Sequence, residues 1–333
     1  MTTPGDDAKD GGGGGPALAR RGGDWADRLA AAAIKGAAWT AILSLVLIFV
    51  FIGKEALPIF TSAEVRQEAD LDRLFLPQAP EAKAEQTAAF AWQPVSETPK
   101  YSLLPLLLGT LKATLIAVLI AIPLAVLAAL FSSEFAPPWA REVIKPAIEL
   151  LAGIPSVVIG FFCLMVLAGW LQAAFGWTFR LNAVTAGIGL SFAVIPIVYT
   201  VSEDAFTSVP QTYREGSVAM GASAWQTAWR VVLPAASPGV FAACVLGFGR
   251  AVGETMIVLM ASGNAAVMSG SPTDSIRTFS ATIAAELGEV VVGSAHYHVL
   301  FFIGAFLFVL TFLTNLFGQW WVGRLQKKLQ GAA

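Results

Sequence analysis

Charged residues are scarce in this chain. Asp, Glu, Lys and Arg make up 13% of its 333 residues and hydrophobic residues make up 56%, whereas a soluble domain carries roughly 25% charged residues. The formal net charge is −2, and no basic run is long enough to follow the backbone of a nucleic acid, so no nucleic-acid partner is expected. This composition predicts an all-α polytopic membrane protein.

Cysteine and histidine are nearly absent as well. The two cysteines, Cys163 and Cys244, both fall inside apolar segments, so we interpret them as small buried side chains and expect no disulfide. The two histidines, His296 and His298, have no further histidine or cysteine near them. They are more typical of polar residues at the start of a helix than of metal ligands, and no metal site is predicted.

The chain also lacks a nucleotide-binding loop of the form G-x4-G-K-[ST]. Its unbroken glycine run, residues 11–15, belongs to a low-complexity stretch. We therefore expect the chain to bind no cofactor of its own and not to be an enzyme that hydrolyses ATP by itself. Residues 1–23 are typical of a disordered tail rather than of a signal peptide, and residues 24–33 are typical of a short helix at a membrane interface.

Long apolar runs dominate what is present. A bilayer core of about 30 Å requires about 20 apolar residues in a helix, and six stretches of this sequence qualify. They are 34–57, 103–131, 147–171, 183–202, 238–262 and 299–322. Proline is tolerated inside such helices where neighbouring protein satisfies the freed carbonyl. Gly153, Pro155 and Ser156 in the third stretch therefore predict a kink that faces protein, and Pro196 predicts another in the fourth.

Basic residues at the ends of these stretches predict the orientation, because Lys and Arg favour the cytoplasmic side. They gather before or near the start of the first stretch and after the last one, at Arg20, Arg21, Arg28, Lys35, Arg324, Lys327 and Lys328. Both termini are therefore expected in the cytoplasm, and the acidic loop after the first stretch is expected outside. The predicted organisation is a tail with an interfacial helix (1–33), a first span (34–57), an outside loop (58–102), a core of five spans (103–325) with an inside loop (203–237), and a cytoplasmic tail (326–333).

The inside loop carries a motif with fixed spacing. Glu215 is followed by Gly221, and after nine intervening residues come Val231, Leu233 and Pro234. Residues that favour helix stand on both sides of the glycine, so two short helices are expected, the second ending at the Leu-Pro pair. Such a knob fits a groove on a partner, although an ordinary amphipathic loop helix is the alternative. Its large side chains, of the kind that anchor interfaces, are Tyr213, Trp225 and Trp229.

An ionisable pair lies within the fifth stretch. Arg250 and Glu254 are four residues apart, which places them on one helix face and lets them pair. Ionisable residues inside a membrane helix mark functional sites by default, and the donor fork of arginine matches a tetrahedral oxyanion. We therefore predict that Arg250 holds an anion in transit, with Glu254 as its resting partner and Thr255 beside them. The alternative is a structural ion pair between subunits.

Several runs of this sequence resemble one family of transport proteins. Residues 249–256, GRAVGETM, and residues 151–160, LAGIPSVVIG, are similar to motifs of phosphate-specific ABC import permeases. The inside loop resembles the EAA loop of ABC import permeases, which docks on a separate ATPase. Together with the stretch 278–289, the resemblance covers about residues 102–325. It favours the PstC type of permease, with the sister PstA type as the alternative.

The resemblance implies the six-helix permease fold of type I ABC importers, with the chain forming half of a phosphate channel in the bacterial inner membrane. The residues implied in the passage of phosphate are Arg250, Glu254, Thr255 and Arg277. Those implied in docking the ATPase are Glu215, Gly221, Val231, Leu233 and Pro234. The implied partners are a second, PstA-like permease, a PstB-like ATPase dimer that binds ATP and magnesium, a PstS-like phosphate receptor and membrane lipid.

Three other functions stay open at this point. An ABC permease for another oxyanion, such as molybdate or sulfate, would carry the same inside loop. An ion-driven secondary transporter would commonly contain inverted repeats and paired broken helices, and no internal repeat is evident here. A membrane scaffold that signals phosphate status would act through its partners.

Overall fold

The computed structural model describes residues 24–77, 90–96 and 98–331. The predicted disordered tail, residues 1–23, lies outside the described residues, and the predicted outside loop, residues 58–102, lies partly outside them. Two units make up the described chain: the residues up to Phe51, and the residues from Ile52 onward.

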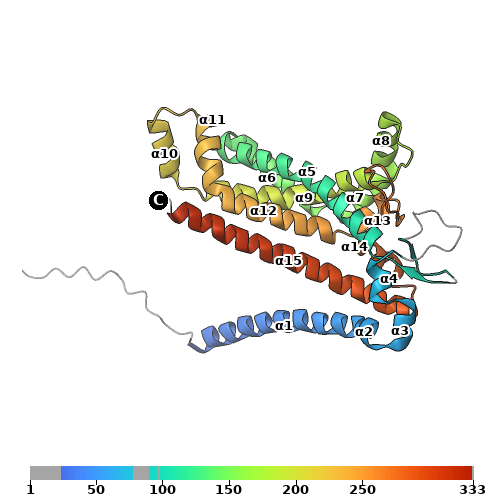
Figure 1. Ribbon diagram of the computed structural model, residues 1–333. Coiled ribbons are helices and arrows are strands. Elements are labelled where there is room, and N and C mark those ends of the chain that lie inside the picture. Colours follow the sequence, from blue (N-terminus) through green and yellow to red (C-terminus); the bar gives the residue numbers. More distant parts are fainter. Residues whose placement is uncertain (1–23, 78–89, 97, 332–333) are drawn as a thin grey trace, which may run out of the picture. The chain divides into compact units, whose positions relative to one another are not determined.

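Helices form most of the described chain (Figure 1). The first four are α1 (Asp24–Ala56), α2 (Pro58–Thr61), α3 (Ala63–Glu68) and α4 (Leu71–Phe75). Two short strands, β1 (Trp92–Gln93) and β2 (Lys100–Tyr101), pair antiparallel. The remaining elements are α5 (Leu104–Glu134), α6 (Pro138–Gly153), α7 (Ser156–Phe162), the π-helix η2 (Cys163–Leu167), α8 (Ala168–Phe175), α9 (Ala183–Thr207), α10 (Gln211–Ala219), α11 (Ala224–Thr227), the π-helix η3 (Ala228–Val232), α12 (Leu233–Gly253), α13 (Met256–Ala261), α14 (Phe279–Glu286) and α15 (Ala295–Gly331).

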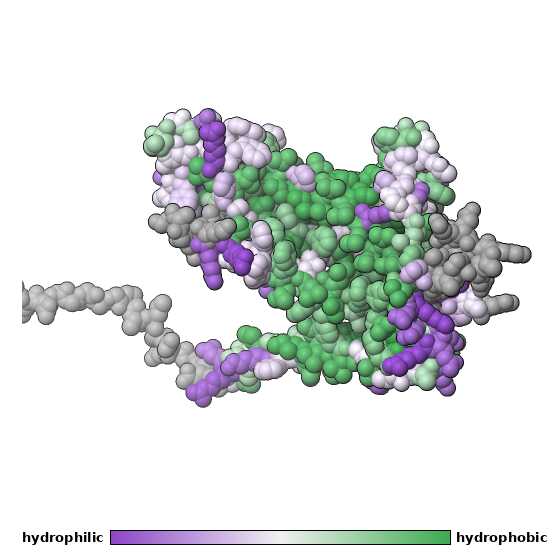
Figure 2. Space-filling model, viewed as in Figure 1, coloured by the Kyte–Doolittle hydropathy of each residue, from purple (hydrophilic) through white to green (hydrophobic). Residues whose placement is uncertain are grey.

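Six helical segments among the described residues are long and apolar enough to cross a membrane. They are Asp27–Thr61, Leu104–Glu134, Ser156–Phe175, Ala183–Thr207, Ala224–Gly253 and Ala295–Lys327. The predicted all-α fold with six membrane-spanning helices is therefore confirmed. Figure 2 shows apolar surface between two polar ends, with polar side chains over α10 and α11 at one end and over α3 and α4 at the other.

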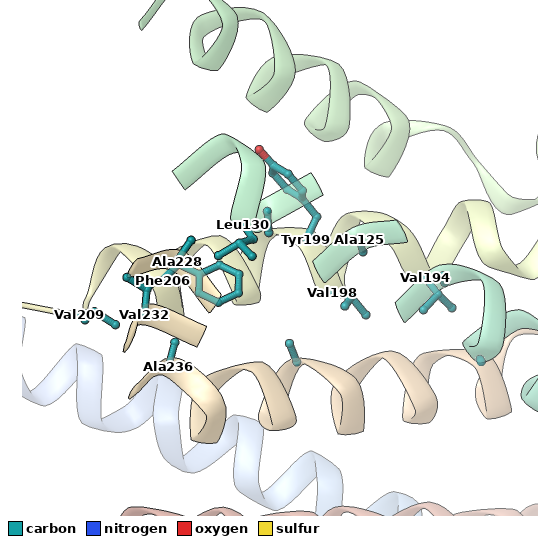
Figure 3. Packing of buried hydrophobic residues seen from close by; sticks show 14 residues of the cluster. Ala125, Leu130, Val194, Val198, Tyr199, Phe206, Val209, Ala228, Val232 and Ala236 are labelled. Atoms are coloured by element: carbon teal, nitrogen blue, oxygen red, sulfur yellow. The ribbon is translucent and has the colours of Figure 1, made fainter. Parts of the chain in front are cut away.

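The packing of α5, α9 and α12 forms the centre of the unit that begins at Ile52. Small residues recur every fourth position along α5, where Ala121, Ala125 and Ala129 are fully buried. Small side chains on one face let two membrane helices approach closely, which increases their van der Waals contact. Val198 and Phe206 of α9 fill the space beside this face, together with side chains of η3 and α12 (Figure 3).

A glycine at the opposite end of α5 allows a still closer approach. Gly109 is buried, and a Cβ atom built on it would overlap the carbonyl oxygen of Arg277, which belongs to the backbone just before α14. This backbone cannot move as a flexible side chain could. Gly109 therefore fixes the segment that carries Arg277 against α5.

Replacing Gly109 by alanine should destabilise the protein by about 1–3 kcal/mol, because the methyl group forces α5 and the Arg277 backbone apart. Thermal unfolding of the purified protein in detergent measures this change. Gly169 of α8 is the matched control, since a Cβ there meets no atom within 4 Å. Gly169→Ala should leave stability unchanged or raise it by up to about 1 kcal/mol through helix propensity. Equal stability of the two variants would refute the packing argument.

The third membrane span differs from its prediction. The sequence placed it at 147–171 with a kink at Pro155, but the helix ends at Gly153 and a new one begins at Ser156. Ile154 is extended, with ψ of 124°, as expected for a residue before proline. Pro155 is therefore a boundary between two helices, and it is exposed in the isolated chain.

The part before this boundary is a separate amphipathic helix, α6. It packs on α9, and Lys145 donates a hydrogen bond to Glu203 at 3.2 Å. Charged residues along α6 are the physical reason why it cannot belong to the span. Pro196, where the other kink was predicted, lies inside the continuous helix α9 and is buried, so it faces protein as predicted.

The fifth span also differs from its prediction. The motif's Leu233 and Pro234 do not end a helix, because the segment runs without interruption from Ala224 to Gly253. The π-helix η3 lies directly before Leu233, whose N–H donates to the carbonyl of Ala228, five residues back. This wider turn accommodates Pro234, which lacks an N–H donor and would clash in an ordinary α-helical turn.

Two further boundaries were predicted in the wrong place. The span ends at Gly253, not at residue 262, and α13 follows as a separate short helix. At the start of the chain, the interfacial helix expected over 24–33 is not separate, since α1 continues through it to Ala56.

Candidate functional site

The end of α12 is a break in the middle of an apolar region. Gly253 is the last helical residue, and Glu254 is extended with ψ of 133°. The break is held from the side by α14, because the hydroxyl of Ser280 donates to the carbonyl of Glu254 at 2.8 Å. The hydroxyl of Thr255 donates back to the carbonyl of Gly253 at 3.3 Å. These bonds satisfy carbonyl groups that the interrupted helix leaves without a partner.

Arg250 and Glu254 meet at this break, as the sequence predicted. Arg250 Nη2 lies 3.7 Å from Glu254 Oε2. Their surroundings differ: 55% of the Arg250 side chain is exposed in the isolated chain, against 8% for Glu254. Glu254 is also fixed by the N–H of Thr255, which donates to Oε1 at 3.2 Å. The buried carboxylate of Glu254 therefore holds one side of the Arg250 guanidinium. The other N–H donors of that guanidinium are open to a ligand.

Arg277 does not join this pair. Its guanidinium donates to Glu286 Oε1, and 17% of its side chain is exposed. Glu286 accepts two more bonds, from Trp92 Nε1 at 3.0 Å and from His296 Nε2 at 2.9 Å. These four residues, the Glu286 cluster, join the strand β1, α14, α15 and the segment before α14. Arg277 is thus positioned as part of a structural cluster, and its predicted role in anion passage gains no geometric support.

The neighbours of Glu286 in this cluster stabilise its ionised carboxylate. Burial opposes ionisation, but the hydrogen bonds from His296 and Trp92 and the charge of Arg277 outweigh it, so the pKa of Glu286 lies below its ordinary value. A carboxyl group with a lowered pKa stabilises the folded state at pH values above its ordinary pKa of about 4.5. This stabilisation is lost as the pH falls through the pKa of the folded state. The cluster should therefore weaken in acid.

Removing the carboxylate tests this cluster. Glu286→Ala leaves Arg277 buried without its partner, so we expect a loss of about 3–5 kcal/mol of unfolding free energy at neutral pH. The melting temperature of the wild type in detergent should fall below about pH 4.5, and that of the variant should fall less. Glu289→Ala, at an exposed neighbouring carboxylate, should change stability by less than about 0.5 kcal/mol. Parallel acid profiles of wild type and Glu286→Ala would contradict the assignment.

A second candidate site is the hairpin formed by α10, α11 and η3, residues 211–232. Gly221 stands at its turn with φ of +84°, a conformation that glycine adopts without strain. The hydroxyls of Ser217 and Thr227 lie 2.9 Å apart across the hairpin, and Ser223 and Gln226 form a capping box at the start of α11. The two short helices predicted around Gly221 are present.

The hairpin is anchored to the rest of the chain by an ion pair that the sequence analysis missed. Arg214 donates to both carboxylate oxygens of Glu134, at 2.7 and 3.1 Å, and to the carbonyls of Phe206 and Val209. The hydrogen bonds with Glu134 raise the pKa of Arg214 above its ordinary value. Four bonds from one guanidinium thus tie α10 to the ends of α5 and α9. The sequence feature that could have indicated Arg214 is its position next to Glu215 of the motif.

The outer face of the hairpin carries exposed apolar side chains. Exposed large residues are Tyr213, Val218, Met220, Trp225 and Trp229, with Met220 the most exposed at 89%. Trp225 and Trp229 contact each other, with ring centroids 5.5 Å apart. Glu215 is exposed on the same hairpin, as is Pro234 just beyond it, whereas Val231 and Leu233 are half-buried. Apolar side chains of this size at a polar end of the molecule indicate a surface that a partner covers.

These two sites belong to one class of protein: a six-span helical membrane protein with a guanidinium at a helix break and, at one end, a hairpin with exposed apolar side chains. A family model described as "Binding-protein-dependent transport system inner membrane component" matches residues 121–331. The chain belongs to this family of transport permeases.

The chain is also similar in sequence to individual transport permeases. The chain is 38% identical over 223 residues to a probable ABC transporter permease, YqgH, of Bacillus subtilis, which covers 67% of this chain and 72% of the relative. It is 36% identical to the phosphate transport system permease PstC 1 of Mycobacterium bovis, covering 68% and 74%. It is 34% identical to the phosphate permease PstC of Xylella fastidiosa, covering 71% and 78%.

Solved structures share the fold. A bacterial alginate ABC transporter matches with a TM-score of 0.54 at 17% identity and covers 84% of this chain and 92% of the solved chain. The MetNI methionine ABC transporter matches with a TM-score of 0.51 at 18% identity and covers 67% and 94%. The predicted fold, that of ABC importer permeases, is confirmed.

Proposed function

We propose that this chain is one of two permease subunits of an ATP-driven importer of inorganic phosphate. The observation that carries the proposal is Arg250, which lies in the last turn of a membrane span, beside the helix break, and whose guanidinium has donors left open by Glu254. A planar fork of donors suits the oxygens of a phosphate anion. Relatives named phosphate transport permeases align with about two thirds of this chain, which favours phosphate over other anions.

The hairpin supplies the coupling step in this proposal. A partner ATPase would bind the exposed side chains around Trp225 and Met220, and its closure on ATP would move the hairpin. Arg214 and Glu134 would transmit this movement to α5 and α9. The helix that carries Arg250, α12, is packed against both. Coupling requires that the two conformations bind the ATPase and the anion with different affinity. The chain itself would remain non-catalytic, with ATP and magnesium bound by the ATPase.

The orientation follows from charge. Basic residues flank the first and last spans, so both termini and the hairpin would lie in the cytoplasm of a bacterial cell, where ATP is available. The opposite end, with β1, β2 and the Glu286 cluster, would face the receptor that delivers phosphate. The remaining partners would be a second, PstA-like permease and the surrounding lipid.

The substrate is tested by competition. The chain is reconstituted with its second permease, ATPase and receptor, and ATP-dependent uptake of labelled phosphate is measured with excess sulfate, molybdate or unlabelled phosphate. We expect only unlabelled phosphate to suppress the signal. ATP-dependent uptake of sulfate or molybdate, without phosphate uptake, would overturn the substrate and leave the class of transporter standing.

A further inference from the structure

One face of α15 carries three amide side chains. Asn315, Gln319 and Gln326 follow each other at spacings of four and seven residues, which puts them on the same side of a helix. All three line a cavity of about 300 Å³ between α15 and α12. Figure 1 shows these two helices side by side, with the C-terminal end of α15 at the same end of the molecule as α10.

These amides differ from the other polar residues of the same helix. Thr311 and Thr314 donate their hydroxyls to carbonyls of α15 itself, at 2.9 and 2.8 Å, and can therefore be tolerated in lipid. In the part of the chain that the structure describes, the amides of Asn315, Gln319 and Gln326 have no hydrogen-bond partner. An amide without a partner is costly in hydrocarbon, so such residues face water or other protein.

The amide face begins beside Arg250. A Cβ atom built on Gly249 would lie 3.9 Å from Asn315 Oδ1, and Gly249 directly precedes Arg250. On α12 the cavity is lined by Ala242 and Leu246, and Arg250 follows Leu246 by four residues, so it continues the same face. The polar groups thus form one line from the guanidinium along α15.

A second cavity continues this line toward the hairpin end. It has a volume of about 440 Å³, and Gln326 lines both cavities. Ser208 and Gly239 contribute to its wall. No Asp or Glu is among the described residues that line either cavity, so no carboxylate forms part of its wall.

We propose that the groove between α12 and α15 is the water-filled route by which the anion leaves Arg250 for the hairpin end. Asn315 and Gln319 are its positioning residues, and their amide N–H groups donate to the oxygens of the passing anion. Neutral donors bind an anion less strongly than a guanidinium does, which lets it move on rather than remain bound. This inference rests on the proposed function, in which Arg250 holds the anion.

Thiol labelling in the assembled transporter tests whether the groove contains water. In a background with Cys163→Ala and Cys244→Ala, Gln319→Cys is compared with Phe317→Cys, which lies on nearly the opposite face of α15 and is also exposed in the isolated chain. A charged thiol reagent should modify Gln319→Cys at least about tenfold faster, because it reacts only where water reaches the thiol. Inorganic phosphate should slow that reaction.

Two labelling results would overturn the inference. Equal rates for Gln319→Cys and Phe317→Cys would mean that the groove faces lipid. Labelling of Gln319→Cys in the isolated chain, but not in the assembled transporter, would mean that a partner helix fills the groove. Neither result depends on phosphate being the substrate. The labelling therefore tests whether the groove contains water even if the wild-type protein takes up no phosphate and the proposed function fails.

Uptake then tests the role of the amides. Asn315→Leu and Gln319→Leu should each lower the initial rate of ATP-dependent phosphate uptake by about tenfold, since each removes a donor to a charged group, while the complex remains assembled. Asn315→Gln should recover part of the rate, and Phe317→Leu should keep the wild-type rate. Wild-type rates in both leucine variants would contradict the inference while leaving the phosphate proposal in place.

Discussion

Replacing Arg250 by glutamine is expected to lower ATP-dependent phosphate uptake by about a hundredfold, the equivalent of about 2.7 kcal/mol, because several charge-assisted hydrogen bonds to the anion are lost. Initial rates in proteoliposomes that contain the assembled transporter measure this effect. Arg250→Lys should retain more activity than Arg250→Gln, since lysine keeps the charge but lacks the planar fork.

The same variant separates the functional interpretation from a structural ion pair. Although Glu254 is buried, Arg250 Nη2 lies 3.7 Å from its Oε2, which is longer than a hydrogen bond. The guanidinium is half exposed, and glutamine keeps an N–H donor beside the carboxylate, so the loss of stability should be only about 0–1 kcal/mol. Arg250→Gln should therefore melt close to the wild type and assemble normally. Wild-type uptake by an assembled Arg250→Gln complex would remove Arg250 from the anion's path. A complex that no longer assembles would instead favour the structural pair between subunits.

Breaking the anchor of the hairpin is the second change with a large expected effect. Arg214→Leu leaves the Glu134 carboxylate, whose side chain is 9% exposed, without its partner, at a cost of about 3–5 kcal/mol. The hairpin then loses its tie to α5 and α9. We expect the number of phosphate ions transported per ATP hydrolysed to fall by about tenfold or more, because ATPase closure no longer reaches the helices around Arg250.

A double variant and a matched control sharpen this experiment. Glu134→Leu combined with Arg214→Leu removes the unpaired charge, so its stability should recover relative to the single variants while coupling stays low. Arg141→Leu changes an exposed arginine of α6 that also reaches the end of α5, through the carbonyl of Ser133. It should keep normal coupling. Normal coupling in Arg214→Leu would show that the hairpin needs no such anchor.

Residues whose neighbours lie close in sequence were predictable. Gly221 was expected to separate two short helices, and the structure places it at φ of +84° in the turn between them. The pairing of Arg250 with Glu254 followed from their spacing of four residues, even though Glu254 proved to lie just beyond the helix end. In both cases the physical cause, a backbone preference or a helix period, is local.

The contacts that sequence reasoning missed join distant segments. Arg214 and Glu134 are 80 residues apart, and Trp92 and Glu286 are 194 apart. No period or spacing connects such residues, because the packing of whole helices brings them together. The pairing of Arg277 with Glu286 was missed for the same reason, because α14 and the segment before it had not been placed.

Pro155 and Pro234 were the other source of error. Proline restricts the backbone of the residue before it and has no N–H donor. A helix boundary, a kink and a wider turn are all compatible with these two properties. Pro155 separates two helices, Pro196 is accommodated inside α9, and Pro234 follows a π-helix. The surrounding packing decided among these outcomes in each case, and the sequence alone offered no means to choose.

The most direct test of the account is the uptake of labelled phosphate by the wild-type chain reconstituted with its permease partner, ATPase and receptor, measured with and without ATP. The account predicts uptake that requires ATP and the ATPase and that is lost in the Arg250→Gln complex. Phosphate uptake that proceeds without the ATPase, driven by an ion gradient, would contradict the central claim that this chain couples ATP hydrolysis to the passage of an anion.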